Sequence, residues 1–339
     1  MSGLQPPSFE DIAAATRRID PFALRTPLLS FPALDEQVGT RVLVKAEMLQ
    51  RMGSFKFRGA YNKIAQLDAR RWPGGVVTCS SGNHAQGVAE AARLRGLKAA
   101  IVMPRDAPAI KVARTKQAGG EVIFYNRAKE DREAIANHLA KERQAAFVAP
   151  YDDRDVIAGQ GTIGVEIVEQ AQSMTANVDC VLAPCSGGGL MSGIAIAVQH
   201  FAPKAELYAI EPKGFDDLAR SIAKGRLERN PATDGSICDA LLVPTPGVIA
   251  FEVLRKRLTG ALSVSDEEAA EAVRYAFEEL KLVVEPSGAV TLAALLSGRL
   301  RIQGQTVAIV LSGGNIDADL FAEIIGAMPA GQAAASQAS

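Results

Sequence analysis

Short apolar runs alternate along the chain with longer segments in which apolar residues recur every three or four positions. The apolar runs predict strands at 41–45, 75–78, 99–103, 121–125, 179–184, 206–211 and 307–311. The periodic segments predict helices at about 8–19, 84–95, 109–117, 160–171 and 190–200, a charged helix ending near 143, and two more starting near 265 and 286. This alternation is typical of an α/β fold, in which helices cover both faces of parallel sheets.

The spacing of these elements indicates two units. Residues 66–149 are long enough for a small α/β domain, and we expect residues 1–65 plus 150–326 to form a larger, discontinuous one. Two such sheets leave a cleft, which loops at the carboxyl ends of the strands would face. Residues 327–339 are rich in Ala, Gln, Gly and Ser and predict a disordered tail.

Composition narrows the functional class. Of 339 residues, 48% are hydrophobic and 22% charged, as in soluble globular proteins, and a net charge of −1 gives no basic footprint for nucleic acid. The apolar runs are shorter than the roughly 18 residues of a membrane-spanning helix, and residues 1–11 show no secretory signal. The cysteines lack a C-x-x-C pair and predict reduced thiols. We therefore expect a cytoplasmic protein that binds neither nucleic acid nor membrane.

The most distinctive polar residue is Lys56, which stands between Phe55 and Phe57 just before a helical pattern. Burying an ammonium group is costly unless the charge is paired. Aromatic neighbours favour the free amine, which is the form that attacks a carbonyl carbon. Taken alone, such a stretch is more often a surface lysine at a helix start, so the loops further along the chain must decide.

A glycine loop, Ser186-Gly187-Gly188-Gly189, joins a predicted strand to the helix that begins at Leu190. Such a loop offers free N–H groups and the positive end of a helix dipole, which favour an anion and most often a phosphate. The pattern G-x-x-x-x-G-K-[ST] fails at Ile194, and G-x-G-x-x-G fails at Ser192. Glu211 still lies at the end of a predicted strand, roughly where dinucleotide enzymes keep a ribose-binding acid, so a nicotinamide oxidoreductase is a distant alternative.

Two further polar loops follow predicted strands. Ser80-Ser81-Gly82-Asn83-His84 offers hydroxyls, an amide and N–H groups at a helix start, which suit a small carboxylate or a ring oxygen. Leu311-Ser312-Gly313-Gly314-Asn315 is a similar loop near the end of the chain. Together with Lys56 and the glycine loop, these segments predict one binding cleft between the two sheets.

In this combination and order, the chain resembles the fold-type II pyridoxal-phosphate enzymes, and within them the threonine/serine dehydratase and serine racemase group. The resemblance covers residues 20–320 and implies a tryptophan synthase β-like fold, with two open parallel-sheet α/β domains and the cofactor in the cleft between them. The matching segments are 25–28, 45–47, 53–60, 80–87, 158–162, 186–190, 285–289 and 312–315.

The resemblance also implies roles. Lys56 would form the Schiff base with pyridoxal 5′-phosphate and, once released by the substrate, remove its α-proton. On the cofactor ring, Phe55 would pack against the face, Asn83 would contact the 3′-oxygen and Ser312 would contact the nitrogen. The cofactor phosphate would be bound by the N–H groups of Ser186, Gly187, Gly188, Gly189 and Leu190. The substrate carboxylate would be bound by Ser80, Ser81, Gly82, Asn83 and His84. Because a hydroxyl at the ring nitrogen does not stabilise a pyridinium, we expect loss of a β-hydroxyl as water, followed by hydrolysis to a 2-oxo acid and ammonia.

Three details refine the resemblance. Ser81 replaces an alanine found in many threonine dehydratases; on the face opposite Lys56 it could reprotonate the carbanion, as in a racemase, or only hydrogen-bond the loop. The carboxylates of Glu211 and Asp217 and the carbonyl of Phe215 resemble the family's cation site, and oxygen ligands suit Mg²⁺ or Ca²⁺. The segment 236–240 ends in alanine where the family has glycine, which leaves the shape of the substrate pocket open.

We therefore expect a pyridoxal-phosphate dependent threonine/serine ammonia-lyase that acts on a small amino-acid substrate, as a homodimer or homotetramer. Serine racemase and 3-hydroxyaspartate ammonia-lyase are the alternatives within the same fold. The alternatives from other classes are the nicotinamide oxidoreductase and a non-catalytic cofactor-binding protein. The presence of Lys56 and the complete 80–84 loop argue against the non-catalytic protein.

Overall fold

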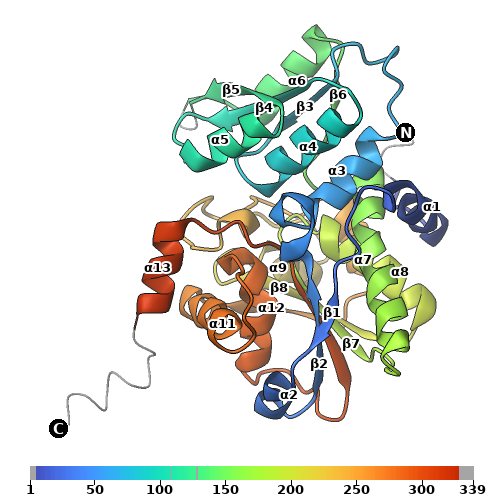
Figure 1. The fold of residues 1–339 in the computed structure, drawn as a ribbon, viewed down its shortest axis with the longest axis vertical. Coiled ribbons are helices and arrows are strands. Elements are labelled where there is room, and N and C mark those ends of the chain that lie inside the picture. The colour runs from blue at the N-terminus through green and yellow to red at the C-terminus, as the bar shows by residue number, and fades with distance from the viewer. Residues whose placement is uncertain (1–4, 108, 127–128, 328–339) are drawn as a thin grey trace.

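A computed structural model describes residues 5–107, 109–126 and 129–327, and it contains two separate sheets (Figure 1). The smaller sheet has the order β5-β4-β3-β6, and all its neighbouring strands are parallel. Its strands are β3 (Val76–Cys79), β4 (Ala99–Pro104), β5 (Gly120–Tyr125) and β6 (Ala146–Phe147). These strands all fall within the predicted small domain.

The larger sheet has the order β1-β2-β10-β7-β8-β9 and is parallel except at its edge, where β1 runs antiparallel to β2. Its strands are β1 (Leu28–Ser30), β2 (Arg41–Ala46), β7 (Cys180–Pro184), β8 (Glu206–Pro212), β9 (Gly260–Val264) and β10 (Thr306–Leu311). The two parallel-sheet units confirm the predicted fold class. We propose that they are the cores of the two predicted domains, with the boundaries given above.

Helices cover the faces of both sheets (Figure 1). They are α1 (Phe9–Ile19), α2 (Pro32–Val38), α3 (Lys56–Ile64), α4 (Asn83–Leu94), α5 (Ala109–Gln117), α6 (Arg132–Glu142), α7 (Arg154–Ser173), α8 (Gly189–Phe201), α9 (Asp217–Lys224), α10 (Val248–Leu254), α11 (Asp266–Glu278), α12 (Pro286–Leu296) and α13 (Ala318–Gly326). Capping boxes at Ser8 and Ser265 begin α1 and α11. Residues 328–339 of the predicted tail lie outside the described residues.

Helix α7 begins earlier than predicted, at residue 154 instead of 160, because the Asp153 carboxylate caps it and its glycines do not interrupt it. Those glycines allow close packing. A Cβ atom on Gly159 would lie 2.6 Å from the Gly59 Cα, and one on Gly164 would lie 2.9 Å from the Ala197 Cβ. Helix α7 therefore packs closely against both α3 and α8.

Helix α3 begins at Lys56 itself, whereas the sequence pattern places this lysine just before the helix. The preceding Gly53 has φ 72°, in the left-handed region that favours glycine. The Phe55 N–H donates to the Ser312 carbonyl over 3.1 Å, and the Gly314 N–H donates to the Gly53 carbonyl over 3.0 Å. These bonds hold the lysine loop against the loop that follows β10, although the two are far apart in sequence.

A buried ion network lies beside α3 and consists of Lys45, Glu47, Arg58 and Glu166. Arg58 donates to both Glu47 oxygens at 2.8 Å each, and its Nη1 donates to Glu166 Oε1 at 2.6 Å. Lys45 Nζ donates to Glu166 Oε2 at 2.5 Å and to the Thr26 carbonyl at 2.6 Å. Every charge in the network thus has a partner of opposite sign, and the network joins β2, α3 and α7.

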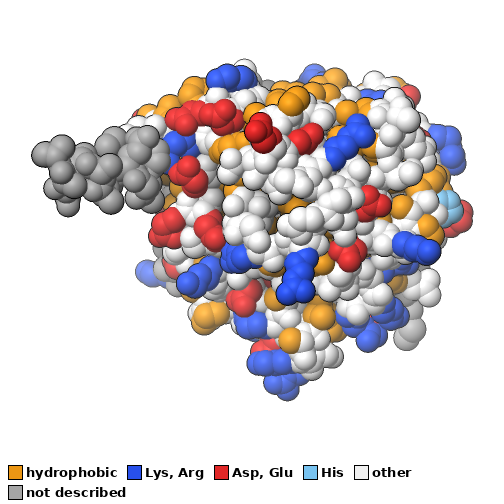
Figure 2. Space-filling model, turned by 90° about the horizontal axis from the view of Figure 1, so that it is seen from below, with side chains coloured by type: hydrophobic (Ala, Val, Ile, Leu, Met, Phe, Trp, Pro, Cys, Tyr) orange, Lys and Arg blue, Asp and Glu red, His pale blue; other side chains and the backbone are white. Residues whose placement is uncertain are grey.

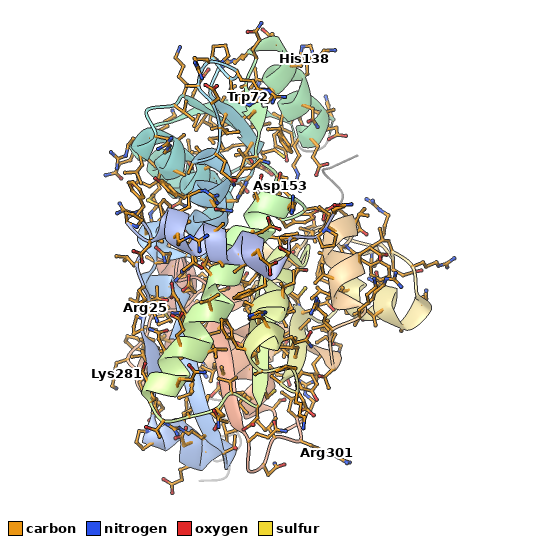
Figure 3. All side chains as sticks on the ribbon, turned by 90° about the vertical axis from the view of Figure 1, so that its right-hand side faces the viewer. Arg25, Trp72, His138, Asp153, Lys281 and Arg301 are labelled. Atoms are coloured by element: carbon orange, nitrogen blue, oxygen red, sulfur yellow. The ribbon has the colours of Figure 1, made fainter. Side chains whose placement is uncertain are left out.

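The surface carries charges of both signs. Figure 2 shows a face on which basic and acidic side chains are interspersed, in keeping with the net charge of −1. In Figure 3, Trp72 and His138 lie at the end of the molecule that holds the smaller sheet, Arg301 lies at the opposite end, and Asp153 lies between them. Within the described part of the chain, no helix combines the length and apolar character needed to cross a membrane.

Candidate active site

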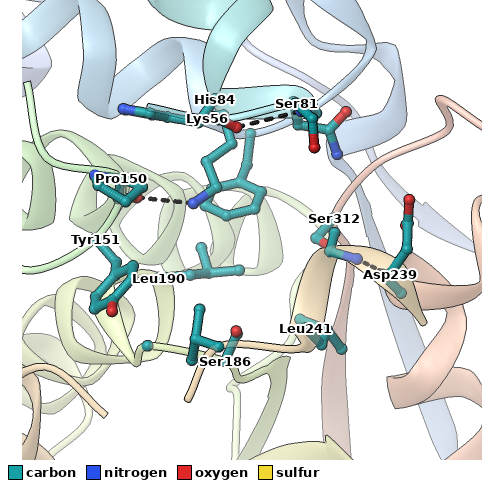
Figure 4. Close-up of a pocket in the computed structure, with 18 of the residues that line it drawn as sticks. Lys56, Ser81, His84, Pro150, Tyr151, Ser186, Leu190, Asp239, Leu241 and Ser312 are labelled. Atoms are coloured by element: carbon teal, nitrogen blue, oxygen red, sulfur yellow. Dashed lines mark hydrogen bonds between the residues drawn. The ribbon is translucent and has the colours of Figure 1, made fainter. Parts of the chain in front are cut away.

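A cavity between the two sheets contains every residue that the sequence assigns to the cofactor and the substrate (Figure 4). Its lining includes Phe55, Lys56, the loop 80–84, residues 186–190 and Ser312. These segments come from the starts of α3, α4 and α8 and from the end of β10. The parallel topology places these ends together, and it confirms the predicted position of the cleft at the carboxyl ends of the strands.

Lys56 enters this cavity from the first turn of α3. Its Nζ donates to the Pro150 carbonyl over 2.8 Å and lies 5.2 Å from the centre of the Phe55 ring (Figure 4). No carboxylate in the described residues forms an ion pair with it. Burial lowers the pKa of Lys56 to about 8, against a smaller opposing effect of Glu285. The amine is therefore more easily deprotonated than an ordinary lysine.

The glycine loop before α8 has the features of a phosphate site. The Ser186 hydroxyl is buried and has no hydrogen-bond partner in the described part of the chain. Gly188 caps α8 with φ 86°, and the first N–H groups of the helix point toward the loop without intrahelical partners. A Cβ atom on Gly187 would lie 2.2 Å from the Tyr151 ring, and one on Gly189 would lie 2.7 Å from the Tyr151 carbonyl. The orphaned hydroxyl, the glycines and the helix start together fit a phosphate.

The loop that begins α4 presents polar groups to the same cavity. Ser81 lies in the cavity wall (Figure 4). His84 Nε2 lies 3.1 Å from the Val148 carbonyl; since a carbonyl only accepts, this nitrogen carries the proton and donates. Burial and the nearby Lys56 lower the pKa of His84 to about 3, so its ring is neutral at physiological pH. His84 thus orients the loop and supplies no charge.

Asn83 is held by two other residues of the cavity. Its Nδ2 donates to Glu285 Oε1 over 2.7 Å, and its Oδ1 accepts from Asn315 Nδ2 over 2.8 Å. Burial and the neighbouring Asp239 raise the pKa of Glu285 to about 7. Ser312 lies in the same wall and is only 4% exposed. The residues present therefore fit a phosphorylated aromatic cofactor, with one Asn83 N–H left for a ring oxygen.

The polar lining residues that the sequence analysis misses include Lys111, Arg132, Tyr151 and, as a functional group, Glu285. The Lys111 Nζ contacts Asp239 Oδ2 at 2.6 Å and so connects α5 with the short 3₁₀ turn Asp239–Leu241. None of the four belongs to a glycine loop, and only Glu285 lies in a segment with a recognisable motif. Only the folded arrangement brings them to the cavity.

The three predicted metal ligands lie outside this cavity. The Glu211 carboxylate accepts two backbone N–H groups of α9, each at 2.9 Å. Asp217 Oδ1 accepts from Asn230 over 2.7 Å, whereas Oδ2 is buried without a partner in the described chain. Burial raises the pKa of Glu211 to about 8 and that of Asp217 to about 6. The described residues contain no cluster of three or more His, Cys, Asp or Glu suited to a metal, so any ion here would also need the buried Phe215 to contribute its carbonyl.

Comparisons with known proteins agree with this geometry. The family model described as pyridoxal-phosphate dependent enzyme matches residues 19–313. The chain is 41% identical to L-threo-3-hydroxyaspartate ammonia-lyase of Pseudomonas sp., covering 95% of this chain and 99% of the relative. It is 38% identical to serine racemase of Schizosaccharomyces pombe, covering 94% and 97%.

A solved structure gives the same result. The crystal structure of threonine deaminase from T.th. matches with a TM-score of 0.87 and 45% identity, covering 92% of this chain and 99% of that one. The similarity therefore extends over both sheets and the cavity between them, and it leaves no support for a nicotinamide oxidoreductase. The chain belongs to the pyridoxal-phosphate dependent enzymes of fold-type II, in the group of ammonia-lyases and amino-acid racemases.

Proposed function

We propose that this enzyme is an ammonia-lyase that removes water from a β-hydroxy amino acid and releases a 2-oxo acid and ammonia. The observation that carries the proposal is the Lys56 amine, which is held by a single carbonyl group in the cavity that also contains the 80–84 loop. L-Threonine and L-serine are the substrates expected from the motifs, with 3-hydroxyaspartate as the third candidate. The names of the relatives, which include threonine and hydroxyaspartate ammonia-lyases, support this reaction class.

Pyridoxal phosphate, when bound, supplies an electron-withdrawing ring that stabilises negative charge on the substrate α-carbon. Binding of the substrate and the phosphate, and transfer of the proton, depend on residues of this chain. The N–H groups at the start of α4 would bind the substrate carboxylate, and those at the start of α8, with Ser186, would bind the phosphate. With a pKa of about 8, the Lys56 amine is partly neutral near physiological pH and accepts the α-proton.

Ser81 supports a second candidate function, serine racemase. Its hydroxyl belongs to the same cavity as Lys56 but comes from a different loop, so it could return a proton to the α-carbon from another side (Figure 4). If so, Ser81→Ala abolishes the conversion of L-serine to D-serine and leaves elimination in place. If Ser81 only hydrogen-bonds the loop, both activities change together.

The test is 2-oxo acid release from L-threonine, L-serine and L-threo-3-hydroxyaspartate, with cofactor and Mg²⁺ present, combined with chiral analysis for D-serine. Release that disappears in Lys56→Ala supports the lyase. Formation of D-serine without any oxo acid supports the racemase instead. Neither product from any of the three substrates contradicts both functions and favours a non-catalytic role.

We also propose that Glu211, Phe215 and Asp217 bind a divalent cation such as Mg²⁺ or Ca²⁺. The support is the buried Asp217 Oδ2, which has no partner in the described chain, beside a second buried carboxylate. We expect MgCl₂ to raise the melting temperature after chelator treatment, and Asp217→Asn to remove the increase. An equal increase in both proteins would argue against the site.

A further inference from the structure

The chain segment whose carbonyl group binds Lys56 is held in place from both ends. Residues 148–153 connect β6 of the smaller sheet with α7. At one end, the buried Val148 donates its N–H to the Val77 carbonyl over 2.9 Å. Near the other end, the Asp152 carboxylate accepts two N–H groups at the start of α10, each at 2.9 Å. Pro150 lies between these two attachments.

The Val148 carbonyl accepts two side-chain hydrogen bonds, and both donors are buried. Thr78, in β3, donates its hydroxyl over 2.7 Å, and His84, in α4, donates from Nε2 over 3.1 Å. Thr78 is fully buried and His84 is 2% exposed. A carbonyl oxygen has two acceptor sites, and here both are used. The peptide group that follows Val148 therefore cannot turn without breaking one of these bonds, which would be costly in a buried position.

The ring of Pro150 transmits this orientation along the chain. It fixes the φ angle of Pro150 and confines the preceding Ala149 to extended conformations. Few backbone angles are therefore free between the Val148 carbonyl and the Pro150 carbonyl. The Pro150 carbonyl in turn accepts a hydrogen bond from Lys56 Nζ over 2.8 Å (Figure 4). The direction in which the amine is held thus depends on the two donors at Val148.

The main chain of Lys56 is also fixed. A Cβ atom on Gly87 would lie 3.2 Å from the Lys56 carbonyl carbon, so α4 packs directly against the first turn of α3. With its backbone fixed and its amine bound to a carbonyl, the lysine side chain has few rotamers left. A neutral amine that donates one hydrogen in this way keeps its lone pair free to accept a proton.

We propose that Thr78 is a positioning residue of the reaction: through the Val148 and Pro150 carbonyls, it orients the free Lys56 amine toward the substrate α-carbon. His84, as the second donor to the Val148 carbonyl, contributes to the same orientation. This inference rests on the proposed function, because it concerns the step in which a proton moves from the α-carbon to Lys56. The Thr78 hydroxyl keeps its own proton throughout.

A role limited to the neighbouring substrate loop is the alternative. Thr78 stands two residues before the 80–84 loop, and His84 belongs to that loop. Loss of the hydroxyl could therefore displace the groups that are expected to bind the substrate carboxylate. The two roles differ in the kinetic constant that they change, because a misplaced base lowers kcat whereas a misplaced binding loop raises KM.

The first test compares Thr78→Val with the wild-type holoenzyme on the three β-hydroxy amino acids named above. Valine keeps the shape of the side chain and removes the donor. We expect kcat to fall about 10- to 100-fold and KM to change by less than about threefold. Deuterium at the substrate α-carbon should slow the variant by a larger factor than the wild type. An unchanged kcat, or a loss that appears only in KM, would overturn the inference while leaving the lyase intact.

Two further variants control for a merely structural effect. Thr78→Ser retains the hydroxyl and should recover most of kcat, and a loss equal to that of Thr78→Val would overturn the inference. Thr115→Val removes another buried hydroxyl of the smaller sheet's unit, which donates to the Lys111 carbonyl over 2.9 Å. It should leave kcat within about twofold of the wild type, and a loss as large as that of Thr78→Val would also overturn the inference. Should Thr78→Val not fold, Thr78→Cys takes its place.

Two measurements separate this inference from the proposed function, because they need no elimination. Exchange of the α-proton of L-alanine with solvent deuterium follows the same proton transfer, and Thr78→Val should slow it about tenfold. In the apoprotein, labelling of Lys56 by acetic anhydride as a function of pH gives its pKa. That pKa should fall in Thr78→Val, because the hydrogen bond to the carbonyl favours the charged form of the amine.

The titratable groups beside Lys56 stay the same in this comparison. Glu285 and His84 both interact electrostatically with Lys56 and are present in either protein. If no β-hydroxy amino acid yields an oxo acid, the proposed function fails, and the two measurements still decide the role of Thr78. An unchanged exchange rate or an unchanged pKa of Lys56 in Thr78→Val would overturn the inference.

Discussion

Lys45 and Lys56 are two buried lysines of the same chain, and their surroundings are opposite. The Lys45 ammonium donates to a carboxylate, a carbonyl and an amide oxygen, from Glu166, Thr26 and Gln170. The Lys56 amine donates to the Pro150 carbonyl alone and faces a cavity. Burial lowers the pKa of both, but neighbouring carboxylates oppose the shift more completely at Lys45.

The comparison shows that burial alone does not make a lysine reactive. In the ion network around Lys45, every charge is neutralised by a fixed partner, so the group contributes to structure. In the cavity, the missing carboxylate keeps the Lys56 amine available for a proton or a carbonyl carbon. Changes in the cavity should therefore affect chemistry, and changes in the network should affect stability.

The largest expected effect is that of Lys56→Ala. Turnover should fall at least about 10³-fold, because the variant lacks both the attachment point and the base. The free energy of unfolding at neutral pH should not fall, because burial of the ammonium destabilises the wild type and the variant leaves no ionic partner behind. Product assays and urea unfolding measure the two effects. If Lys56→Ala kept an activity within tenfold of the wild type, Lys56 would not be the reactive lysine, and its contrast with the structural Lys45 would fail.

The reverse effect is expected for Arg58→Met, in the network. Glu47 and Glu166 would lose their shared guanidinium and remain buried, so the free energy of unfolding should fall by about 3–5 kcal/mol. Urea unfolding measures the loss, and Glu166→Gln should reproduce part of it. A loss below about 1 kcal/mol would mean that the network does not stabilise the fold.

The pH dependence of cofactor uptake sharpens the comparison further. Because the Lys56 pKa is about 8, the neutral fraction of the apoprotein should rise about tenfold per pH unit up to that value and then level off. The rate of cofactor uptake, followed by absorbance, should rise and level off over the same pH range.

The folded chain also binds fewer protons than the unfolded chain at pH values between the lowered pKa of Lys56 and the ordinary lysine pKa. Stability should therefore rise with pH across that window, and Lys56→Met should remove this part of the rise.

Gly187→Ala tests the cavity without touching a charge. Its new Cβ would meet the Tyr151 ring, so the glycine loop or the ring must shift, and we expect cofactor affinity to fall about 10- to 100-fold. Gly326→Ala, at a position with open space around it, is the matched control and should leave affinity unchanged. Equal cofactor affinity in both variants would contradict the phosphate assignment.

The smallest effect is expected for an exposed ion pair. Arg25 and Glu169 contact each other at 2.9 Å, with about half of each side chain exposed. Arg25→Ala should change the free energy of unfolding by less than about 1 kcal/mol, because solvent screens the pair. Urea unfolding of Arg25→Ala and Arg58→Met compares the free energy of unfolding that is lost at an exposed and at a buried arginine. A comparable loss for both variants would contradict the account of the network.

The sequence predicts the central elements of this fold because their signals are local. The apolar runs of β3, β4, β7 and β10 are buried along nearly their whole length, and the serine caps of α1 and α11 lie in the sequence beside their helices. Short elements such as β1, β6 and α10 are missed because two to seven residues carry too little periodicity. Helix α7 is truncated in the prediction because its glycines, which serve helix packing, resemble breakers.

The residues of the candidate site also divide into those that a local sequence pattern reveals and those that it does not. Lys56, the glycine loop and the 80–84 loop carry their chemistry in consecutive residues, so a pattern reveals them. Arg132 and Tyr151 reach the cavity from segments without a motif, through the packing of α6 and the chain between the two sheets. Their role depends on which long-range neighbours they meet, and the sequence pattern does not contain that information.

The most direct test of the central claim is to find where the cofactor is attached. The holoenzyme is reduced with borohydride and digested, and the peptide that carries the added cofactor mass is identified by mass spectrometry. The account predicts the label on Lys56, with none on Lys45 and none in Lys56→Ala. A label on another lysine of the wild-type protein, or no label on a protein that retains the cofactor, would contradict the assignment of Lys56.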